Sequence, residues 1–440
     1  MSKIRKDIEE NTTALQENYS NLSSQIKDKL EWFQDQKIGI IFHWGLYSQA
    51  GIVESWQLSQ EDDWARKKES WRNDIDTLRK DYWALNHVFC PENFEPQIWA
   101  EKAKSAGFRY MIFTTKHHDG FNMYDTQYSN YKITAADSSF HTNKKADILK
   151  HLIDAFHKKD IATGLYYSKA DWHSPYYWKD GQKPVGRYAS YDPKEDSKTW
   201  KKFSQYVKNQ LIELVKNYGP TDILWLDGGW INTTHNEYLP MDDIASELRI
   251  IQPDLLIVDR AVGGKYENYV TPERKIPETP PKKAWESNIP LAKNWGYVPN
   301  DEYKSFVEIL SSVVQVVSLG GNIILGVGPK PDGTLPKEAQ NIMSQLGDWL
   351  QIYGEGIYET RPYQDFTQKD WFFTWKKNNI YAFHKNIGGK ISLDLENFPL
   401  RIKKVINMET KETLLFDRQS ISTLQQAEFI GIQLKLEENL

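Results

Sequence analysis

Residues 105–121, SAGFRYMIFTTKHHDGF, join a continuous apolar run directly to a cluster of polar side chains. The run from 110 to 115 is aromatic, aliphatic or β-branched, which is typical of a strand covered on both faces. His117 and His118 follow it, between a lysine and an aspartate. A strand that ends in this way carries hydrogen-bonding and ionisable groups to one rim of a sheet, which favours chemistry over simple solubility.

Further apolar runs of the same character alternate with amphipathic stretches such as 96–107, 146–160 and 201–219. Strands that alternate with helices pair in parallel, because a parallel pair needs a crossover connection. Besides 109–118, the expected strands are 37–44, 161–168, 222–229, 255–260 and 320–329.

Polar residues stand at the carboxyl ends of these runs. In a parallel barrel all such ends meet at one face, where barrel enzymes keep their active sites. We therefore expect an α/β fold with a (β/α)8-like barrel. Its working rim would carry His43, His117, His118, Tyr166, Asp227 and Arg260. An open doubly wound sheet is the alternative, but the chain has neither a G-x-G-x-x-G turn after the first strand nor a P-loop.

The pattern changes near residue 355, where strands that alternate apolar and polar residues replace the strand–helix alternation. We expect a C-terminal antiparallel β-sandwich over 356–440, preceded by a catalytic barrel over 31–355. Residues 1–30 space their apolar side chains as a polar surface helix would. Stretches 60–82 and 265–290 are rich in charge and are expected to be long loops on the active face.

Composition argues against several partners. The formal net charge is −5 and no long basic block occurs, which argues against nucleic acid. Cys90 is the only cysteine, so neither an internal disulfide nor a cysteine-rich metal site can form. With no apolar signal core and no run approaching 18 apolar residues, we expect a cytoplasmic protein without membrane contact. Whether the chain forms a homo-oligomer is left open.

Aromatic residues are abundant, with 17 Trp and 24 Tyr, many of them beside polar groups. Such rings suit the apolar faces and hydroxyl edges of sugars, although they also fill protein cores. Composition alone does not decide between these two roles.

Three carboxylates are candidates for catalysis. Asp227, in LWLDGGW, ends a buried strand, where an unpaired carboxylate is costly and therefore has partners or a task. A turn or a helix cap is the simpler alternative. Trp225 shares its strand face and could wall a pocket. Glu273 and Glu286 lie in the expected loop 265–290, which could supply the mobile acid of a two-carboxylate glycosidase, although either could be an ordinary surface glutamate.

The adjacent histidines could hold sugar hydroxyls or a metal ion. A metal would need further ligands, for which His43, His173 and Asp119 are candidates. The spacing matches no metal motif such as H-E-x-x-H. We therefore expect neither a metal nor a cofactor.

Six stretches in order resemble the α-L-fucosidases of glycoside hydrolase family 29, from about Trp32 to the carboxyl end. They are WFQDQKIGIIFHWGLYS (32–48), TTKHHDGFNMYDT (114–126), IATGLYYSKADWH (161–173), LWLDGGW (224–230), WESNIPLAKNWGY (285–297) and SLGGNIILGVGPKPDGTLP (318–336). Each is a weak signal singly, whereas the ordered set is specific.

The resemblance implies a retaining exo-glycosidase that removes terminal α-L-fucose, with Asp227 of the W-x-D motif as nucleophile. The residues that it assigns to the sugar pocket are His43, Trp56, His117, His118, Tyr166, Trp225, Arg260 and Trp295. Many relatives carry a glutamate directly before the tryptophan that matches Trp56. Here Ser55 stands at that position, so Glu54 would need a shifted backbone to reach the sugar.

The expected mechanism has two steps. Asp227 attacks the anomeric carbon while a loop glutamate protonates the departing oxygen, and the same glutamate then activates water. We favour Glu273 over Glu286 because Pro272 restrains the chain beside it. The expected substrate is a fucosylated oligosaccharide or glycoconjugate, and the sequence does not specify its glycosidic linkage. A metal-dependent hydrolase and a catalytically inactive carbohydrate-binding protein are the alternatives.

Overall fold

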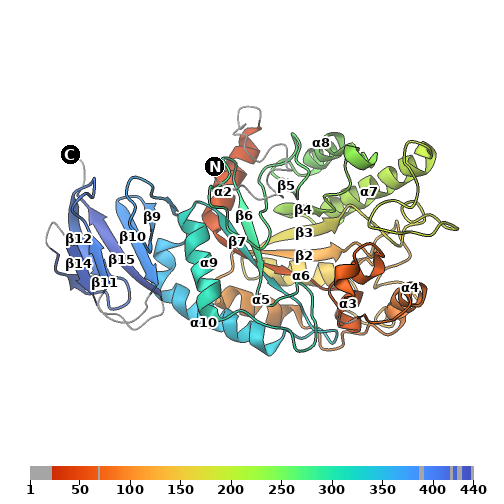
Figure 1. Ribbon diagram of the computed structural model, residues 1–440, viewed down its shortest axis with the longest axis horizontal. Helices are drawn as coiled ribbons and strands as arrows, with labels where there is room; N and C mark the ends of the chain where they lie inside the picture. Colours follow the sequence, from red (N-terminus) through yellow and green to blue (C-terminus); the bar gives the residue numbers. More distant parts are fainter. Residues whose placement is uncertain (1–21, 68–69, 386–390, 417–419, 424–428, 438–440) are drawn as a thin grey trace.

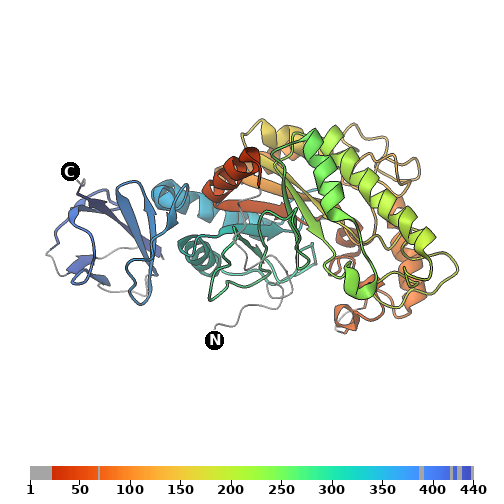
Figure 2. The ribbon, with the colours of Figure 1, turned by 90° about the horizontal axis from the view of Figure 1, so that it is seen from above.

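The computed structural model describes residues 22–67, 70–385, 391–416, 420–423 and 429–437. A curled parallel sheet with surrounding helices forms the larger part, and an antiparallel module follows it (Figure 1). Figure 2 shows these two parts side by side along the long axis of the molecule. The expected barrel and carboxyl-terminal sandwich are therefore confirmed.

Seven parallel strands form the barrel sheet in the order β5-β4-β3-β2-β1-β7-β6. Their bounds are Ile38–Phe42 for β1, Tyr110–Lys116 for β2, Ala162–Ser168 for β3, Ile223–Asp227 for β4, Leu256–Asp259 for β5, Glu286–Pro290 for β6 and Asn322–Val327 for β7. All their residues are buried except the first of β3, as the continuous apolar runs predict. Strand β6 was not predicted from the sequence, because ESNIP is short and polar.

An extended segment, residues 268–274, fills the gap between the edge strands β5 and β6. The backbone N–H of Asn268 donates to β5 at 2.8 Å. On the other side, the N–H of Arg274 donates to the carbonyl of Asn288 in β6 at 2.8 Å. The segment thus occupies the eighth position of the barrel and carries Glu273 near its carboxyl end. The loop expected over 265–290 is therefore corrected in part: Glu286–Pro290 form β6, and Val270 and Glu273 make isolated bridges, whereas the remainder has no helix or strand.

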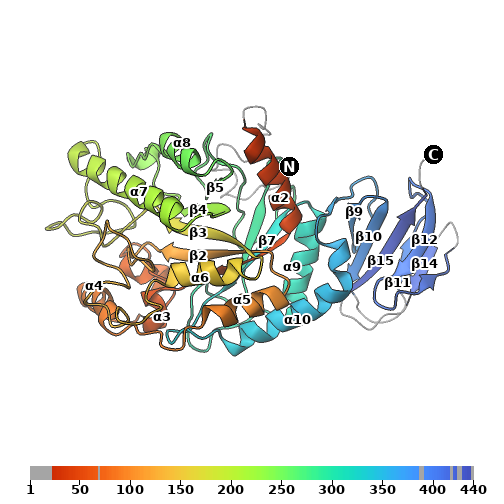
Figure 3. The ribbon, with the colours of Figure 1, turned by 180° about the vertical axis from the view of Figure 1, so that it is seen from behind.

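Helices lie on the outside of the barrel (Figure 3). They are α5 (Pro96–Ser105), α6 (Ile148–His157), α7 (Ser197–Asn217), α8 (Met241–Ile251), α9 (Phe306–Ser318) and α10 (Lys337–Tyr353). The shorter α3 (Leu46–Ala50) and α4 (Ile75–Trp83) follow β1. Helix α4 corrects the loop expected over 60–82. It forms because Asp74 caps it, accepting from the Thr77 N–H at 2.7 Å, while Leu78 and Tyr82 bury one face.

Helix α2, Ser24–Gln36, closes the amino-terminal end of the barrel. Its residues Ile26, Leu30 and Phe33 recur at helical spacing and are buried. The Phe33 ring lies 4.4 Å from that of Tyr269 and 5.8 Å from that of Tyr110 in the barrel interior, measured between centroids. The helix therefore belongs to the barrel core, in contrast to the expected surface helix. Residues 1–21 lie outside the described part of the chain.

The carboxyl-terminal module is two packed antiparallel sheets, ordered β13-β12-β15-β10-β9-β8 and β11-β14. The strands are β8 (Arg361–Pro362), β9 (Trp371–Lys376), β10 (Asn379–Lys385), β11 (Ile391–Asp394), β12 (Ile402–Asn407), β13 (Thr413–Leu414), β14 (Ser420–Thr423) and β15 (Phe429–Leu436). The module packs on the barrel through α10, where the Trp349 indole donates to the Phe429 carbonyl at 3.2 Å. It lies at the opposite end of the molecule from α3 and α4 (Figures 1 and 3).

Candidate active site

A pocket of about 1030 Å³ opens at the carboxyl ends of the barrel strands. It brings together every candidate sugar-binding residue and two of the three candidate carboxylates. These are His43, Glu54, Trp56, His117, His118, Tyr166, Trp225, Arg260 and Trp295, with Asp227 and Glu273. The third carboxylate, Glu286, does not line the pocket, and neither does any described residue of the sandwich.

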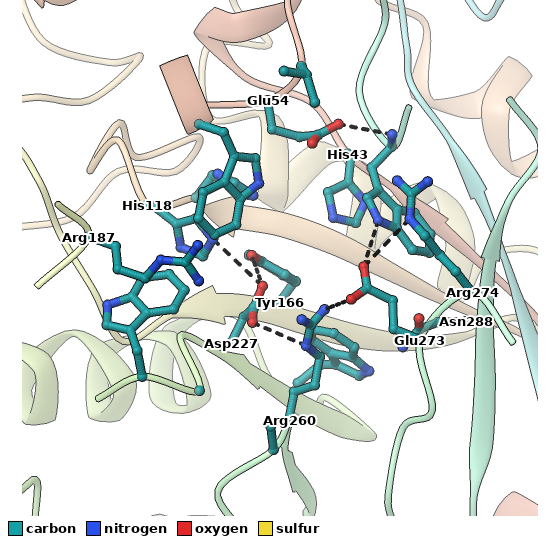
Figure 4. A pocket seen from close by; sticks show the side chains of 18 of the residues that line it. His43, Glu54, His118, Tyr166, Arg187, Asp227, Arg260, Glu273, Arg274 and Asn288 are labelled. Carbon is teal, nitrogen blue, oxygen red and sulfur yellow. Dashed lines mark hydrogen bonds and ion pairs between the residues drawn. The ribbon is translucent and has the colours of Figure 1, made fainter. Parts of the chain in front are cut away.

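Asp227 ends β4, and four groups surround its carboxylate, three of which are drawn in Figure 4. The Tyr166 hydroxyl donates to its Oδ2 at 2.6 Å and the Gly228 N–H to its Oδ1 at 2.7 Å. Arg260 Nε lies 3.7 Å from Oδ1, and His118 Nε2 lies 3.8 Å from Oδ2. Burial raises the pKa of Asp227, but the positive Arg260 and these hydrogen bonds outweigh it and hold the pKa well below its usual value. Asp227 is therefore an ionised carboxylate, as a nucleophile must be.

Glu273 faces Asp227 across the same arginine. Arg260 Nη1 lies 2.7 Å from Glu273 Oε2, and the Trp295 indole donates to Oε1 at 3.0 Å. Arg274 Nε lies 3.7 Å from Oε1. One guanidinium thus contacts both pocket carboxylates, which fixes their relative position.

Glu286 begins β6 and is fully buried inside the barrel. It accepts from the Tyr110 hydroxyl at 2.6 Å and from the Trp225 indole at 3.2 Å. Burial raises its pKa to about 7. Glu286 therefore supports the pocket wall from below, through Trp225, and has no access to a bound sugar. The structure does not favour the alternative that Glu286 is the acid/base.

The three candidate histidines are buried, and burial lowers the pKa of each, to about 4 for His117 and well below 6.5 for His43 and His118. They are therefore neutral near pH 7. The Ser168 hydroxyl donates to the Ala170 carbonyl at 2.9 Å, so it accepts from His118 Nδ1, 2.7 Å away. This assigns the proton of His118 to Nδ1 and leaves Nε2 as an acceptor for a sugar hydroxyl.

Glu54 reaches the pocket through the shifted backbone that its position requires, with a left-handed φ of 34°. Its Oε1 accepts from the N–H groups of Trp295 at 2.9 Å and Gly296 at 2.7 Å. Burial raises its pKa to about 7. Ser55 points instead to His117, with 2.6 Å between its hydroxyl and Nδ1.

Several pocket residues were not predicted from the sequence, namely Arg187, Tyr188, Trp230, His235, Arg274, Asn288 and Lys293. Arg187 lies in a turn-rich stretch after β3 that has no periodic signal. Trp230 stands at the end of LWLDGGW, so the motif that identified Asp227 also contained it.

Within the described residues, no group of three or more His, Cys, Asp or Glu side chains is arranged to hold a metal ion. In the same part of the chain, no helix is both long and apolar enough to cross a membrane.

A pocket at the carboxyl-terminal face of a parallel barrel, with two carboxylates and aromatic walls, is typical of a glycoside hydrolase. Comparison with known families agrees and is more specific. Residues 5–355 match the family described as Alpha-L-fucosidase, and the chain belongs to this family.

Individual relatives cover most of the chain. Human tissue alpha-L-fucosidase is 28% identical over 400 residues, 87% of this chain and 78% of its own. The bovine (Bos taurus) tissue alpha-L-fucosidase is 30% identical over 374 residues, 80% of this chain and 74% of its own. Among solved structures, alpha-L-fucosidase isoenzyme 1 from Paenibacillus thiaminolyticus has a TM-score of 0.77 at 25% identity, covering 94% and 100% of the two chains. The Thermotoga maritima alpha-fucosidase, solved with fucose, has a TM-score of 0.73 at 27% identity, covering 92% and 96%.

Proposed function

We propose that the protein is a retaining, exo-acting α-L-fucosidase that releases terminal α-L-fucose from oligosaccharides or glycoconjugates. The observation that carries the proposal is the pair Asp227 and Glu273, held by one guanidinium at the base of a pocket of neutral histidines and aromatic rings. Fucose in the Thermotoga maritima relative supports the identity of the sugar.

In the first step an oxygen of Asp227 attacks the anomeric carbon, the bond to the leaving oxygen breaks, and Glu273 gives that oxygen its proton. The aspartate is suited to attack because it is charged and only partly exposed, at 12% of its side chain. The product is a fucosyl ester of Asp227 and a free aglycone.

In the second step Glu273 accepts a proton from water, whose oxygen bonds to the anomeric carbon as the ester bond to Asp227 breaks. The neutral histidines bind ring hydroxyls without placing positive charge beside the oxocarbenium-like transition state. Glu54 and Trp295 would complete the contacts with the sugar.

The test is hydrolysis of an activated aryl α-L-fucoside beside the matching galactoside, with the product anomer followed by proton NMR. We expect turnover of the fucoside and initial release of α-fucose. Initial release of β-fucose would show that the enzyme inverts the anomeric configuration. Equal turnover of both glycosides would show that the enzyme is not specific for fucose. A cytoplasmic location remains a prediction, which cell fractionation would test. The oligomeric state is open to measurement by light scattering.

A further inference from the structure

One side of the pocket mouth is formed by Arg187, Tyr188, Trp230 and His235, which we call the mouth wall. The Arg187 guanidinium lies 5.2 Å over the Trp230 ring, and the Tyr188 and His235 rings stack with centroids 4.1 Å apart. The rings of Trp230 and His118 are in an edge-to-face arrangement, with centroids 4.8 Å apart. The wall therefore runs from the buried sugar site outward to solvent, where 34% of the Arg187 side chain is exposed.

The position of the wall indicates which part of a substrate meets it. A terminal sugar occupies the closed end of a blind pocket, so the next sugar lies at the mouth. Flat aromatic rings suit the apolar face of a pyranose. The guanidinium of Arg187 pairs with Asp62 through Nη2, which leaves further N–H groups to donate to hydroxyls.

The wall comes from two separate loops, and Glu237 joins them. Arg187 and Tyr188 belong to the loop after β3, whereas Trp230, His235 and Glu237 belong to the loop after β4. Glu237 is 1% exposed and accepts from the Ala189 N–H at 2.7 Å. Its other oxygen lies 2.8 Å from the hydroxyl of Tyr177, in the first loop.

The Tyr177 hydroxyl is the centre of this link. It accepts from the Trp230 indole at 3.1 Å and lies 3.1 Å from the Arg187 carbonyl, as well as close to Glu237. A hydroxyl has one proton, so it cannot donate to both the carbonyl and a carboxylate. The conflict disappears if Glu237 carries a proton and donates it to Tyr177, which then donates to the Arg187 carbonyl. Burial raises the pKa of Glu237 to about 8, in agreement with this arrangement.

We propose that the mouth wall binds the pyranose to which fucose is attached, and that Glu237 is the positioning residue that locks the two loops of the wall together through Tyr177. The proposal rests on the proposed fucosidase activity and concerns only the leaving-group side of the same pocket. Neither Glu237 nor Tyr177 lines the pocket.

The test compares two substrates that share fucose and differ at the leaving group. One is α-L-fucosyl fluoride, whose leaving group is a single atom. The other is the α-L-fucosyl disaccharide that the wild-type enzyme cleaves best from a set of linkages. We expect Tyr177→Phe and Glu237→Leu to lower kcat/KM about tenfold for the disaccharide and less than about twofold for the fluoride.

Two further variants separate positioning from a general loss of structure. In Glu237→Gln the amide can donate to Tyr177 and its oxygen can accept from Ala189, so kcat/KM for the disaccharide should stay within about threefold of wild type. Tyr191→Phe removes a hydroxyl of the same loop that donates to the Tyr176 carbonyl at 2.6 Å without joining the network. It should leave both substrates unaffected. Circular dichroism and Tm measurements identify variants that fail to fold, and Tyr177→Phe carries the test if Glu237→Leu is one of them.

Each other outcome has a definite meaning. Equal losses on both substrates, or a Glu237→Gln variant as impaired as Glu237→Leu, would overturn the positioning role. If Tyr177→Phe leaves kcat/KM for the disaccharide unchanged, the mouth wall does not take part in substrate recognition. If the wild-type enzyme cleaves the fluoride but no disaccharide, the mouth wall proposal fails while the fucosidase activity stands. If it cleaves neither, the proposed function itself fails.

Discussion

Arg260 contacts both pocket carboxylates, at 3.7 Å from Asp227 and 2.7 Å from Glu273. The surroundings of the two carboxylates differ in ways that suit the two proposed tasks. Asp227 has a hydroxyl and a backbone N–H to stabilise its charge, so it stays ionised and ready to attack. Glu273 has an indole N–H and lies nearer the solvent, with 25% of its side chain exposed, as a group that exchanges protons with water requires.

Asp227→Gly should lower kcat roughly 10⁴-fold while the fold is retained, because the covalent route is lost. Added azide can occupy the vacated space and attack from the same side. It should restore turnover and yield β-fucosyl azide, identified by NMR. Wild-type-like activity without azide would show that another group is the nucleophile.

Glu273→Ala should impair a natural disaccharide far more than an aryl fucoside with a very acidic phenol, because only the poor leaving group needs a proton. We expect a difference of about 10²-fold or more between the two substrates, with α-fucosyl azide formed when azide is added. Glu286→Gln is the matched control, since Glu286 is buried below the pocket, and it should show no such dependence on the leaving group. The reverse pattern would show that Glu286, and not Glu273, is the acid/base.

At the scale of elements, two segments complete the barrel that the seven parallel strands form in part. Segment 268–274 fills the eighth position of the barrel and presents Glu273 at the rim. Helix α2 covers the opposite end and places Phe33 against Tyr269. Tyr269 lies in segment 268–274, so the helix supports the very backbone that carries the proposed acid/base.

Phe33→Ala should destabilise the fold by about 3–5 kcal/mol, because it opens a cavity at a fully buried aromatic contact. The free energy of unfolding, measured by urea titration, checks this value. Lys27→Ala lies on the exposed face of the same helix and should change stability by less than about 0.5 kcal/mol. Equal effects of the two changes would mean that α2 does not pack as described.

At the scale of the whole molecule, the barrel supplies the pocket and the sandwich supplies packing. The described sandwich residues contribute nothing to the pocket, yet its strands share a continuous core with α10 through Tyr353 and Phe383.

Buried carboxyls are spread over the barrel part. Burial raises the pKa of Glu54, Asp119 and Glu286 to about 7 and that of Glu237 to about 8.

These pKa values make stability depend on pH. A carboxyl whose pKa is higher in the folded state stabilises the fold fully below its unfolded pKa, and this contribution is lost as pH rises through the folded value. For Glu286, with a shift from 4.5 to about 7, the loss is roughly 3 kcal/mol. The stability of wild type relative to Glu286→Gln should therefore fall between pH 4.5 and 7, as followed by urea denaturation at a series of pH values. A difference independent of pH would contradict the buried, protonated state.

The sequence predicted those parts of the molecule that depend on local pattern. Six of the seven barrel strands are continuous apolar runs, and the rule that polar residues at their ends converge located His43, His117, His118, Asp227 and Arg260. Strand β6 could not be found in this way, because it is short and polar: its backbone pairs with segment 268–274, and its Glu286 side chain accepts from Tyr110 in the barrel interior. Nor does residue spacing reveal that a positive φ at Glu54 directs its side chain into the pocket.

Helix α2, Tyr110 and Glu286 fill the space beneath the pocket. The pocket is therefore closed at its inner end, and a sugar enters and leaves through the mouth. A glycan cannot thread through it, so an enzyme built this way is not processive. After each cleavage both the shortened glycan and the freed monosaccharide must leave by the same opening before the next chain end enters. Fucose in the interior of a polymer would be out of reach until other enzymes exposed it. Accumulated fucose would compete with substrate, and product inhibition would limit the rate late in a digestion.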